Sequence, residues 1–445
     1  MTPLRQERDR LGWSRARLAH ELERRAQGRF ALATRTSLLR MISGWESGSR
    51  DTSEPYRTLL AESYGRPPEE LGMNGGTDRA RSDIGLVYAS SMSDALAVLA
   101  DLARFDDMGH VAVTQGRYQP EALNAACLDW LFGAAKLDIV ETRSRRQVTH
   151  RDIDEIKTTT EMFDGLDRKF GGDGCRGMAV KYLREGVLPR MGAAKDETTE
   201  RELYRATAVL CELIGWMSYD TSRNSLAQRY FTQALRFADA AGDRAYAAYV
   251  LSSMADQALF LRRSDQALRL AQVARDASER ANVPVAMTEA YVFEARALAA
   301  RGDASGCRAA LQRAEASYNR IVPGESPAWA SHWSEVLFAS HAGTCWVELN
   351  KPVEAEALIQ LVWDSAKDQT RRRVYSGVQL ARIALLRGDV DQASAYGIGA
   401  LESTNGSTSH RSHQQLVDLR DRLKPHASRA SVTDFQERAR LLLAS

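Results

Sequence analysis

Between residues 215 and 400 the chain repeats one spacing of small and apolar residues five times. A small residue is followed 12, 16 and 19 positions later by further small or apolar residues, and successive repeats begin 40, 40, 48 and 38 residues apart. The repeats are Gly215, Ala227, Phe231, Ala234; Ala255, Ala267, Ala271, Ala274; Ala295, Cys307, Leu311, Ala314; Gly343, Ala355, Ile359, Val362; and Ala381, Ala393, Gly397, Ala400. Two helices approach closely only where side chains are small, so the pattern predicts stacked pairs of helices in an all-α fold.

The same offsets resemble those of tetratricopeptide repeats, in which small residues lie where helix A crosses helix B. Turn signals agree with this register, because Gly302-Asp303, Asn350-Lys351-Pro352 and Gly388-Asp389 each fall between the two expected helices of a unit. The wide spacing indicates helices longer than those of the common 34-residue unit. The alternative is a series of unrelated helical hairpins, which the five concordant repeats disfavour.

The resemblance implies a concave groove lined by fixed positions of helix A. Transferred onto this register, those positions are Glu212, Trp216, Tyr219, Asp220, Tyr249, Ser252, Asp256, Glu289, Arg296, Ser340, Thr344, Tyr375 and Arg382. Aromatic residues mixed with both signs of charge suit an extended peptide better than a lipid or a nucleotide. An equally weighted alternative is that these residues contact other segments of the same chain or a partner subunit.

Charge is unevenly distributed along the chain. Residues 1–50 hold eleven arginines against five acids, whereas the whole chain has a formal net charge of +2. A compact basic segment joined to a mildly acidic body is typical of a module that binds a polyanion such as nucleic acid. The alternative is a general preference for arginine over lysine, against which only the clustering argues.

The N-terminal segment predicts three short helices. Thr2-Pro3 begins the first, which Gly12 ends; Ser14 is a good N-cap for the second; and Ser37 is expected to cap the third. The run SLLRMISGWESG, residues 37–48, resembles the recognition helix of XRE-class helix-turn-helix proteins, with Ile42, Trp45, Glu46 and Gly48 in register. The resemblance implies a lambda-repressor-like domain whose third helix enters the DNA major groove.

In that geometry Ser37, Arg40 and Ser43 face the bases, and Arg40 is able to bridge guanine O6 and N7. Arg35 and Arg50 flank the helix and are better placed for phosphates. Two departures weaken the assignment of base contacts. Fourteen residues separate Leu22 from Ser37, so either the second helix extends through Arg25 or a loop is inserted, and Gly44 replaces a long polar side chain.

These features predict a domain order. Residues 1–72 form the helix-turn-helix domain, 73–83 a linker, 84–200 a helical middle region, 201–402 about five repeats, and 403–445 C-terminal capping helices. In the middle region Thr149 and Asp152 predict a capping box, followed by an apolar stripe through Phe170 that ends at Gly171-Gly172. The nearby run LDRKFGGDGCR resembles the middle region of actinobacterial regulators with this domain order.

Signals for catalysis are weak. Gly172, Gly174 and Gly177 spell GxGxxG, but a helix is expected before them where a dinucleotide site needs a strand. His341 and Cys345 lie one helical turn apart with His332 nearby, although core packing explains them better than a metal. We expect no cofactor, no metal and no enzyme activity. Five scattered cysteines and no long apolar run favour a cytoplasmic protein without disulfides or membrane contact.

The sequence therefore predicts a transcription regulator that binds double-stranded DNA as a homodimer. It resembles the Gram-positive peptide-pheromone receptors of quorum sensing, which implies that the repeats bind a peptide or another small signalling molecule. The alternative is an interaction scaffold, in which the repeats bind a partner protein and the N-terminal domain serves for docking.

Overall fold

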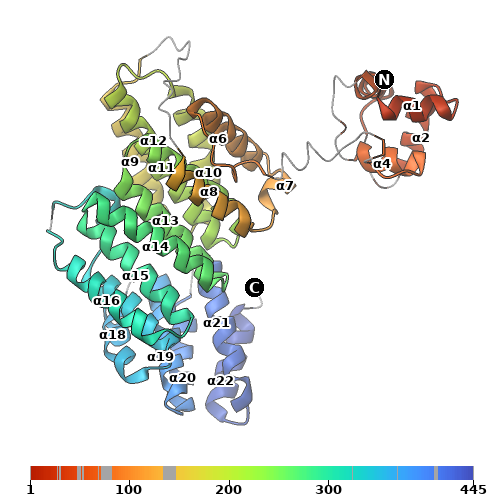
Figure 1. The fold of residues 1–445 in the computed structure, drawn as a ribbon. Coiled ribbons are helices and arrows are strands. Elements are labelled where there is room, and N and C mark those ends of the chain that lie inside the picture. Colours follow the sequence, from red (N-terminus) through yellow and green to blue (C-terminus); the bar gives the residue numbers. More distant parts are fainter. Residues whose placement is uncertain are drawn as a thin grey trace. The chain divides into compact units, whose positions relative to one another are not determined.

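The chain folds into helices throughout the part that the structure describes. The computed structural model describes residues 2–443 apart from residues 28, 30, 31, 48–51, 53, 54, 69, 72–82, 134–146, 323, 368 and 405–408. Over these residues the one β-type pairing is an isolated bridge between Val148 and Ala194, so the predicted all-α class is confirmed. The chain divides into two compact units, Met1–Asp83 and Ile84–Ser445 (Figure 1).

The N-terminal unit contains four helices around its own core: α1 (Pro3–Arg10), α2 (Arg15–Ala26), α3 (Arg35–Ser47) and α4 (Tyr56–Tyr64). Ser14 caps α2 as predicted, because its hydroxyl accepts the backbone N–H of Arg17 at 3.1 Å. Each helix contributes one apolar face to the core, which includes Leu4, Leu18, Leu22, Leu38, Ile42, Trp45, Leu59, Leu60 and Tyr64.

A buried carboxylate ties three of these helices together. Glu46, near the end of α3, has a fully buried side chain that accepts hydrogen bonds from Arg8 on α1 and from Arg15 on α2. Burial alone would raise the pKa of Glu46, but the two guanidinium groups outweigh burial and lower it. This ion cluster holds the third helix against the first two.

Two details of the predicted N-terminal helices are wrong. Helix α3 begins at Arg35, because the carbonyl of Thr34 accepts the first helical hydrogen bond from Leu38 at 2.8 Å; Ser37 is therefore inside the first turn and is not the cap. Arg35 consequently starts the helix instead of flanking it. Of the two alternatives for the long connection, the extension of α2 is confirmed, since α2 continues to Ala26.

The C-terminal unit begins with helices that cover the first repeat: α6 (Met92–Asp107), α7 (Val111–Thr114), α8 (Pro120–Phe132), α9 (His150–Phe170) and α10 (Asp173–Tyr182), followed by a π-helical turn (Leu183–Val187) and a 3-10 turn (Leu188–Arg190). The capping box of Thr149 and Asp152 is present. The predicted apolar stripe of α9 ends before Phe170, whose side chain is exposed.

Five antiparallel helix pairs follow and stack down the unit in Figure 1. They are α11 (Glu197–Asp220) with α12 (Asn224–Ala240), α13 (Arg244–Phe260) with α14 (Ser264–Ala281), α15 (Pro284–Ala300) with α16 (Ala304–Tyr318), α17 (Glu335–Glu348) with α18 (Pro352–Ser365), and α19 (Thr370–Leu386) with α20 (Val390–Glu402). A 3-10 turn (Ala328–Ala330) precedes α17. Helix α21 (His410–Leu423), a 3-10 turn (Lys424–His426) and α22 (Ala430–Leu443) end the unit.

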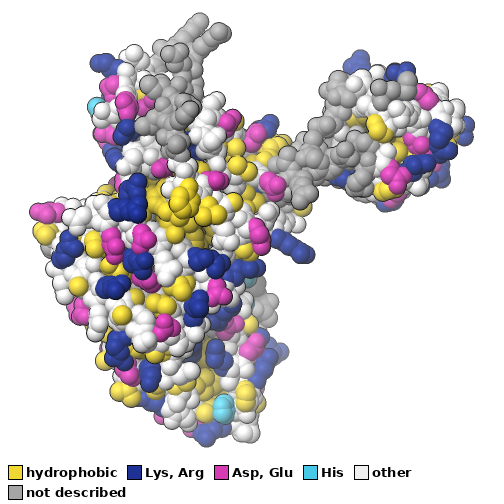
Figure 2. Space-filling model, viewed as in Figure 1, with side chains coloured by type: hydrophobic (Ala, Val, Ile, Leu, Met, Phe, Trp, Pro, Cys, Tyr) yellow, Lys and Arg dark blue, Asp and Glu magenta, His cyan; other side chains and the backbone are white. Residues whose placement is uncertain are grey.

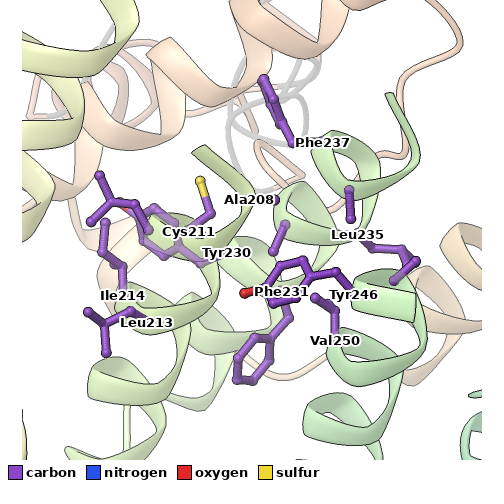
Figure 3. Packing of buried hydrophobic residues seen from close by; sticks show 14 of the residues in the cluster. Ala208, Cys211, Leu213, Ile214, Tyr230, Phe231, Leu235, Phe237, Tyr246 and Val250 are labelled. Carbon is purple, nitrogen blue, oxygen red and sulfur yellow. The ribbon is translucent and has the colours of Figure 1, made fainter. Parts of the chain in front are cut away.

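Small residues lie where the paired helices cross, as the spacing predicts. A Cβ atom on Gly215 would lie 2.6 Å from the ring of Phe231 on α12, and one on Gly343 would lie 2.6 Å from Ile359 on α18. Figure 3 shows Ile214, Phe231 and Tyr246 gathered in the core where the first two pairs meet. The close approach of the helices therefore depends on the missing side chains.

The region that the structure describes contains no helix that is both long enough and apolar enough to cross a lipid bilayer.

Candidate functional site

A large cavity runs along the first helices of the five pairs. Its volume is about 1630 Å³, which exceeds that of most small-molecule pockets. Side chains from α11, α13, α15, α17 and α19 line it, α9 contributes at one end, and α21 together with the segment before α17 covers it. The cavity thus lies inside the C-terminal unit, where residues distant in sequence come together.

The structure brings twelve of the thirteen predicted groove residues onto the wall of this cavity. They are Glu212, Trp216, Tyr219, Asp220, Tyr249, Asp256, Glu289, Arg296, Ser340, Thr344, Tyr375 and Arg382. The exception is Ser252, which is fully buried and donates its hydroxyl hydrogen bond to the carbonyl of Ala248 at 3.1 Å. The register set by the small residues therefore places the predicted residues on one surface, while their ligand contacts stay a prediction.

The centre of the cavity contains a cluster of opposite charges. Arg296 on α15 donates to the carboxylate of Asp256 on α13 at 2.5 Å, and Arg411 on α21 lies 3.7 Å from the same carboxylate. Burial would raise the pKa of Asp256, but the two arginines outweigh it and lower the pKa. Arg411 also lies over the ring of Tyr219, 4.4 Å from its centroid. These charges compensate one another within the protein.

A second ion cluster joins the first helix pair to the last elements of the chain. Arg371 on α19 donates to Asp220 at 3.3 Å and to Asp167 on α9 at 2.9 Å. The hydroxyl of Ser409, the N-cap of α21, donates to Asp220 at 2.8 Å. We call Asp167, Asp220, Arg371, Ser409 and Arg411 the clasp, because they bridge the cavity between its two ends.

One end of the cavity is aromatic. Tyr246 and Tyr249 on α13 stack with ring centroids 5.8 Å apart, and Trp329 lies 5.3 Å from the first ring and 5.1 Å from the second. Two glutamates, Glu212 and Glu289, line the same region. Burial raises the pKa of each carboxyl to about 8, although hydrogen bonds from Ser253 to Glu212 and from Trp333 to Glu289 oppose that rise.

The two histidines considered as metal ligands lie beside this aromatic end. Burial is the main cause that lowers the pKa of His341 to about 3 and that of His332 to about 4, so both imidazoles are neutral at pH 7. The His341 ring contacts Phe293 and Trp333, with centroids 5.4 and 6.0 Å apart. Among the described residues no three His, Cys, Asp or Glu side chains converge as metal ligands would.

In the N-terminal unit the predicted DNA contacts have different surroundings. Ser37 and Arg40 are exposed on α3, Ser43 is half-buried, and no carboxylate in the described part of the chain pairs with Arg40. Arg35 instead pairs with Glu23 of α2 at 2.7 Å. Arg50 lies outside the described residues. Figure 2 shows basic and acidic side chains on the surfaces of both units.

Several cavity residues were missed from the sequence. Tyr246 lies on the same helix face as the predicted Tyr249, one turn earlier, so helical periodicity gives a signal for it. Trp329 and His332 lie between the third and fourth repeats, which begin 48 residues apart instead of about 40. This longer spacing indicates an insertion and gives a signal for both residues. Arg371 and Arg411 lie outside the repeated positions, and nothing in the spacing points to them.

Neither the protein-family models nor the curated proteins with which the chain was compared match it.

Proposed function

We propose that the protein is a sequence-specific DNA-binding transcription regulator whose repeat unit senses a ligand. In this proposal the N-terminal unit is a helix-turn-helix domain of the XRE class, and the C-terminal unit is a tetratricopeptide-like solenoid. The observation that carries the proposal is the two-sided character of α3. One face packs Leu38, Ile42 and Trp45 into the core, and the other presents polar and cationic side chains to solvent.

The exposed face of α3 suits a DNA major groove. Ser37, Arg40 and Ser43 are spaced by three residues and therefore share one face of the helix. The buried ion cluster of Glu46 with Arg8 and Arg15 fixes this helix, so its outer side chains are held in one orientation. A rigid helix with an unpaired arginine at its centre supports direct readout of guanine.

The cavity supports the sensing half of the proposal. Its volume of about 1630 Å³ accommodates a short peptide or a small signalling molecule, and its walls carry aromatic, acidic and basic groups. A ligand acts on DNA binding only through different affinities for two arrangements of the protein. We expect a homodimer in which ligand binding changes the spacing of two α3 helices, because one such domain alone buries little DNA surface.

Replacing Arg40 with alanine should weaken binding to a specific duplex by about 1–3 kcal/mol, since one bidentate arginine–guanine contact contributes that much discrimination. We would select duplexes from a random pool with the native protein and measure affinities by fluorescence anisotropy at two salt concentrations. The matched control is Arg24→Ala, which removes an exposed arginine of α2 that pairs with Glu21.

Arg24→Ala should leave the sequence preference unchanged. If Arg40→Ala keeps both the affinity and the preference of the native protein, the assignment of α3 as the reading helix is wrong. A second outcome is that the native protein enriches no duplex and binds all sequences equally, with affinity that is lost at higher salt. That outcome would contradict the proposed regulator and favour the interaction scaffold.

A further inference from the structure

The aromatic end of the cavity is built unlike the rest of its wall. The rings of Tyr246, Tyr249 and Trp329 contact one another, and the centroid of the His332 ring lies 6.0 Å from that of the Tyr249 ring. All four side chains line the cavity, and His332 is neutral at pH 7. We call these four residues the aromatic pocket. Tyr246 is fully buried, whereas Tyr249 and Trp329 are half-buried and offer electron-rich ring surface to the cavity.

Two acidic side chains at the aromatic pocket have no basic partner. Glu212 accepts a hydrogen bond from the Ser253 hydroxyl at 2.9 Å, and Glu289 accepts one from the Trp333 indole N–H at 2.6 Å. Among the described residues, no lysine, arginine or histidine nitrogen lies within ion-pairing distance of either carboxyl. A buried carboxyl without an ion-pair partner is costly, and a strongly perturbed carboxyl that lines a cavity is a candidate functional group.

A third polar group at the same place is also unsatisfied. Tyr246 is fully buried and lines the cavity, yet its hydroxyl has no hydrogen-bond partner among the described residues. The Glu212 carboxyl is the charged group with the largest influence on this phenol. The unsatisfied Tyr246 hydroxyl beside Glu212, with Glu289 on the same cavity wall, therefore offers acceptor oxygens that no basic side chain among the described residues fills.

The charged groups around the aromatic pocket indicate which ligand charge would complement it. Asp256 is already compensated by Arg296 and Arg411, and Asp164 pairs with Arg168 at 2.8 Å. Arg372 forms no ion pair with any described residue, and it lies close enough to influence His332. If both Glu212 and Glu289 ionise when a ligand binds, their two negative charges exceed the single positive charge of Arg372 by one, which a cationic ligand would balance.

We infer that the aromatic pocket binds the ammonium group of an organic amine, with the cation on the ring faces and its N–H groups donated to Glu212, Glu289 and the Tyr246 hydroxyl. Cations bind preferentially over tyrosine and tryptophan rings, and buried carboxylates add charge-assisted hydrogen bonds. A bare metal ion fits less well, because no group of three ligating side chains converges among the described residues. This inference names the ligand class for the cavity used in the proposed function.

The test is calorimetric titration of the full chain with three molecules of the same shape and different charge. They are 2-phenylethylamine, which is a cation at pH 7, neutral 2-phenylethanol, and the anion 3-phenylpropanoate. We expect saturable binding of the amine, about tenfold or more tighter than binding of the alcohol, and no binding of the anion. DNA is absent from this experiment, so a failure of amine binding can be distinguished from a failure of the proposed DNA-binding function.

Proton release provides an independent readout. The free carboxyls of Glu212 and Glu289 have pKa values of about 8, so both are largely protonated at pH 7. A bound ammonium favours their ionised forms and lowers these pKa values, and protons are released. Asp164 also acts electrostatically on Glu212, and Asp256 and Arg296 act on Glu289. The measured enthalpy should therefore differ between phosphate and MOPS buffers, and affinity should rise from pH 6.5 to pH 8.

The variants Glu212→Gln and Glu289→Gln should each weaken amine binding about tenfold and reduce the proton release. Glutamine keeps the shape of the side chain and can still accept the hydrogen bond from Ser253 or Trp333. The matched control is Glu161→Gln, because Glu161 also lines the cavity but is exposed to solvent. Affinity in this control should equal that of the native protein.

Three results would overturn the inference. The first is amine binding no tighter than alcohol binding, and the second is the absence of saturable amine binding at millimolar concentrations. The third is unchanged affinity in both glutamine variants, with circular dichroism showing that they fold. If the amine binds as expected but leaves affinity for a selected duplex unchanged, the pocket stands and its link to DNA binding is wrong.

Discussion

The free energy of unfolding of the C-terminal unit should fall by about 3 kcal/mol as the pH rises from 6.5 to 8. The cause is the pair of buried carboxyls, Glu212 and Glu289, whose pKa values of about 8 lie well above their ordinary value of 4.5. Their protonated forms are favoured in the folded protein. The stability that they contribute is full below the unfolded pKa of 4.5 and is lost as the pH rises through about 8.

The two neutral histidines confine this effect to a narrow window. His341 and His332 have pKa values of about 3 and 4 in the folded protein, below their ordinary value of 6.5. Their contribution is therefore present above pH 6.5 and is lost as the pH falls below it. Between pH 4.5 and 6.5 the histidines gain stability with rising pH while the glutamates lose it, so the two pairs oppose each other. Above pH 6.5 the remaining gain from the histidines is smaller than the loss from the glutamates, so stability falls.

Urea denaturation followed by tryptophan fluorescence at pH 6.5, 7, 7.5 and 8 measures this dependence. A double variant with Glu212→Gln and Glu289→Gln should show no fall in stability over the same range, because neither amide titrates. A native midpoint that stays constant or rises toward pH 8 would contradict the prediction, as would an equal fall in the double variant. The upper limit of pH 8 lies below the pKa of Cys127 and of Cys175, which burial raises to about 11; a hydrogen bond with Cys345 instead lowers the pKa of Cys307 from its ordinary value of 9.0.

Sequence spacing predicted the wall of the cavity because the repeat fixes the rotation of each first helix. Once Gly215 is placed against Phe231, the positions of Glu212, Trp216 and Tyr219 on α11 follow from helical geometry. The same register was wrong for Ser252, which is fully buried although it precedes Ala255 by three residues, just as Glu212 precedes Gly215. A small shift in helix rotation decides whether a side chain lines the cavity or packs in the core.

The contacts that hold α19 and α21 against the first helices of the unit could not be predicted from the sequence. Arg371 contacts Asp167, 204 residues away in the sequence, and Ser409 contacts Asp220, 189 residues away. Such pairs depend on the accumulated rotation of five helix pairs, which small changes in each crossing angle alter. The capping of α3 was missed for a local reason, because Thr34 and Ser37 are both suitable caps and only the carbonyl hydrogen bond of Thr34 distinguishes them.

The position of α21 over the cavity depends on Asp220, a member of the clasp. This carboxylate is the last residue of α11, where the helix dipole disfavours a negative charge. It is nevertheless buried, because Arg371, Arg411 and the Ser409 hydroxyl surround it at the N-terminal ends of α19 and α21. Removing the carboxylate leaves two partly buried arginines without their partner, which is more costly than losing a surface ion pair.

Replacing Asp220 with alanine should therefore destabilise the C-terminal unit by about 3 kcal/mol and loosen α21 from the cavity. Hydrogen exchange should rise in the His410–Leu423 helix and in the first turn of α19, while α14 and α16 keep their protection. Asp434→Ala is the matched control, because Asp434 pairs with Arg438 on the surface of α22 and should contribute less than about 1 kcal/mol. If the Asp220 variant is as stable as the native protein and hydrogen exchange in α21 is unchanged, apolar packing alone holds α21 over the cavity. A selective rise in α21 would instead show that the clasp holds this helix in place over the cavity.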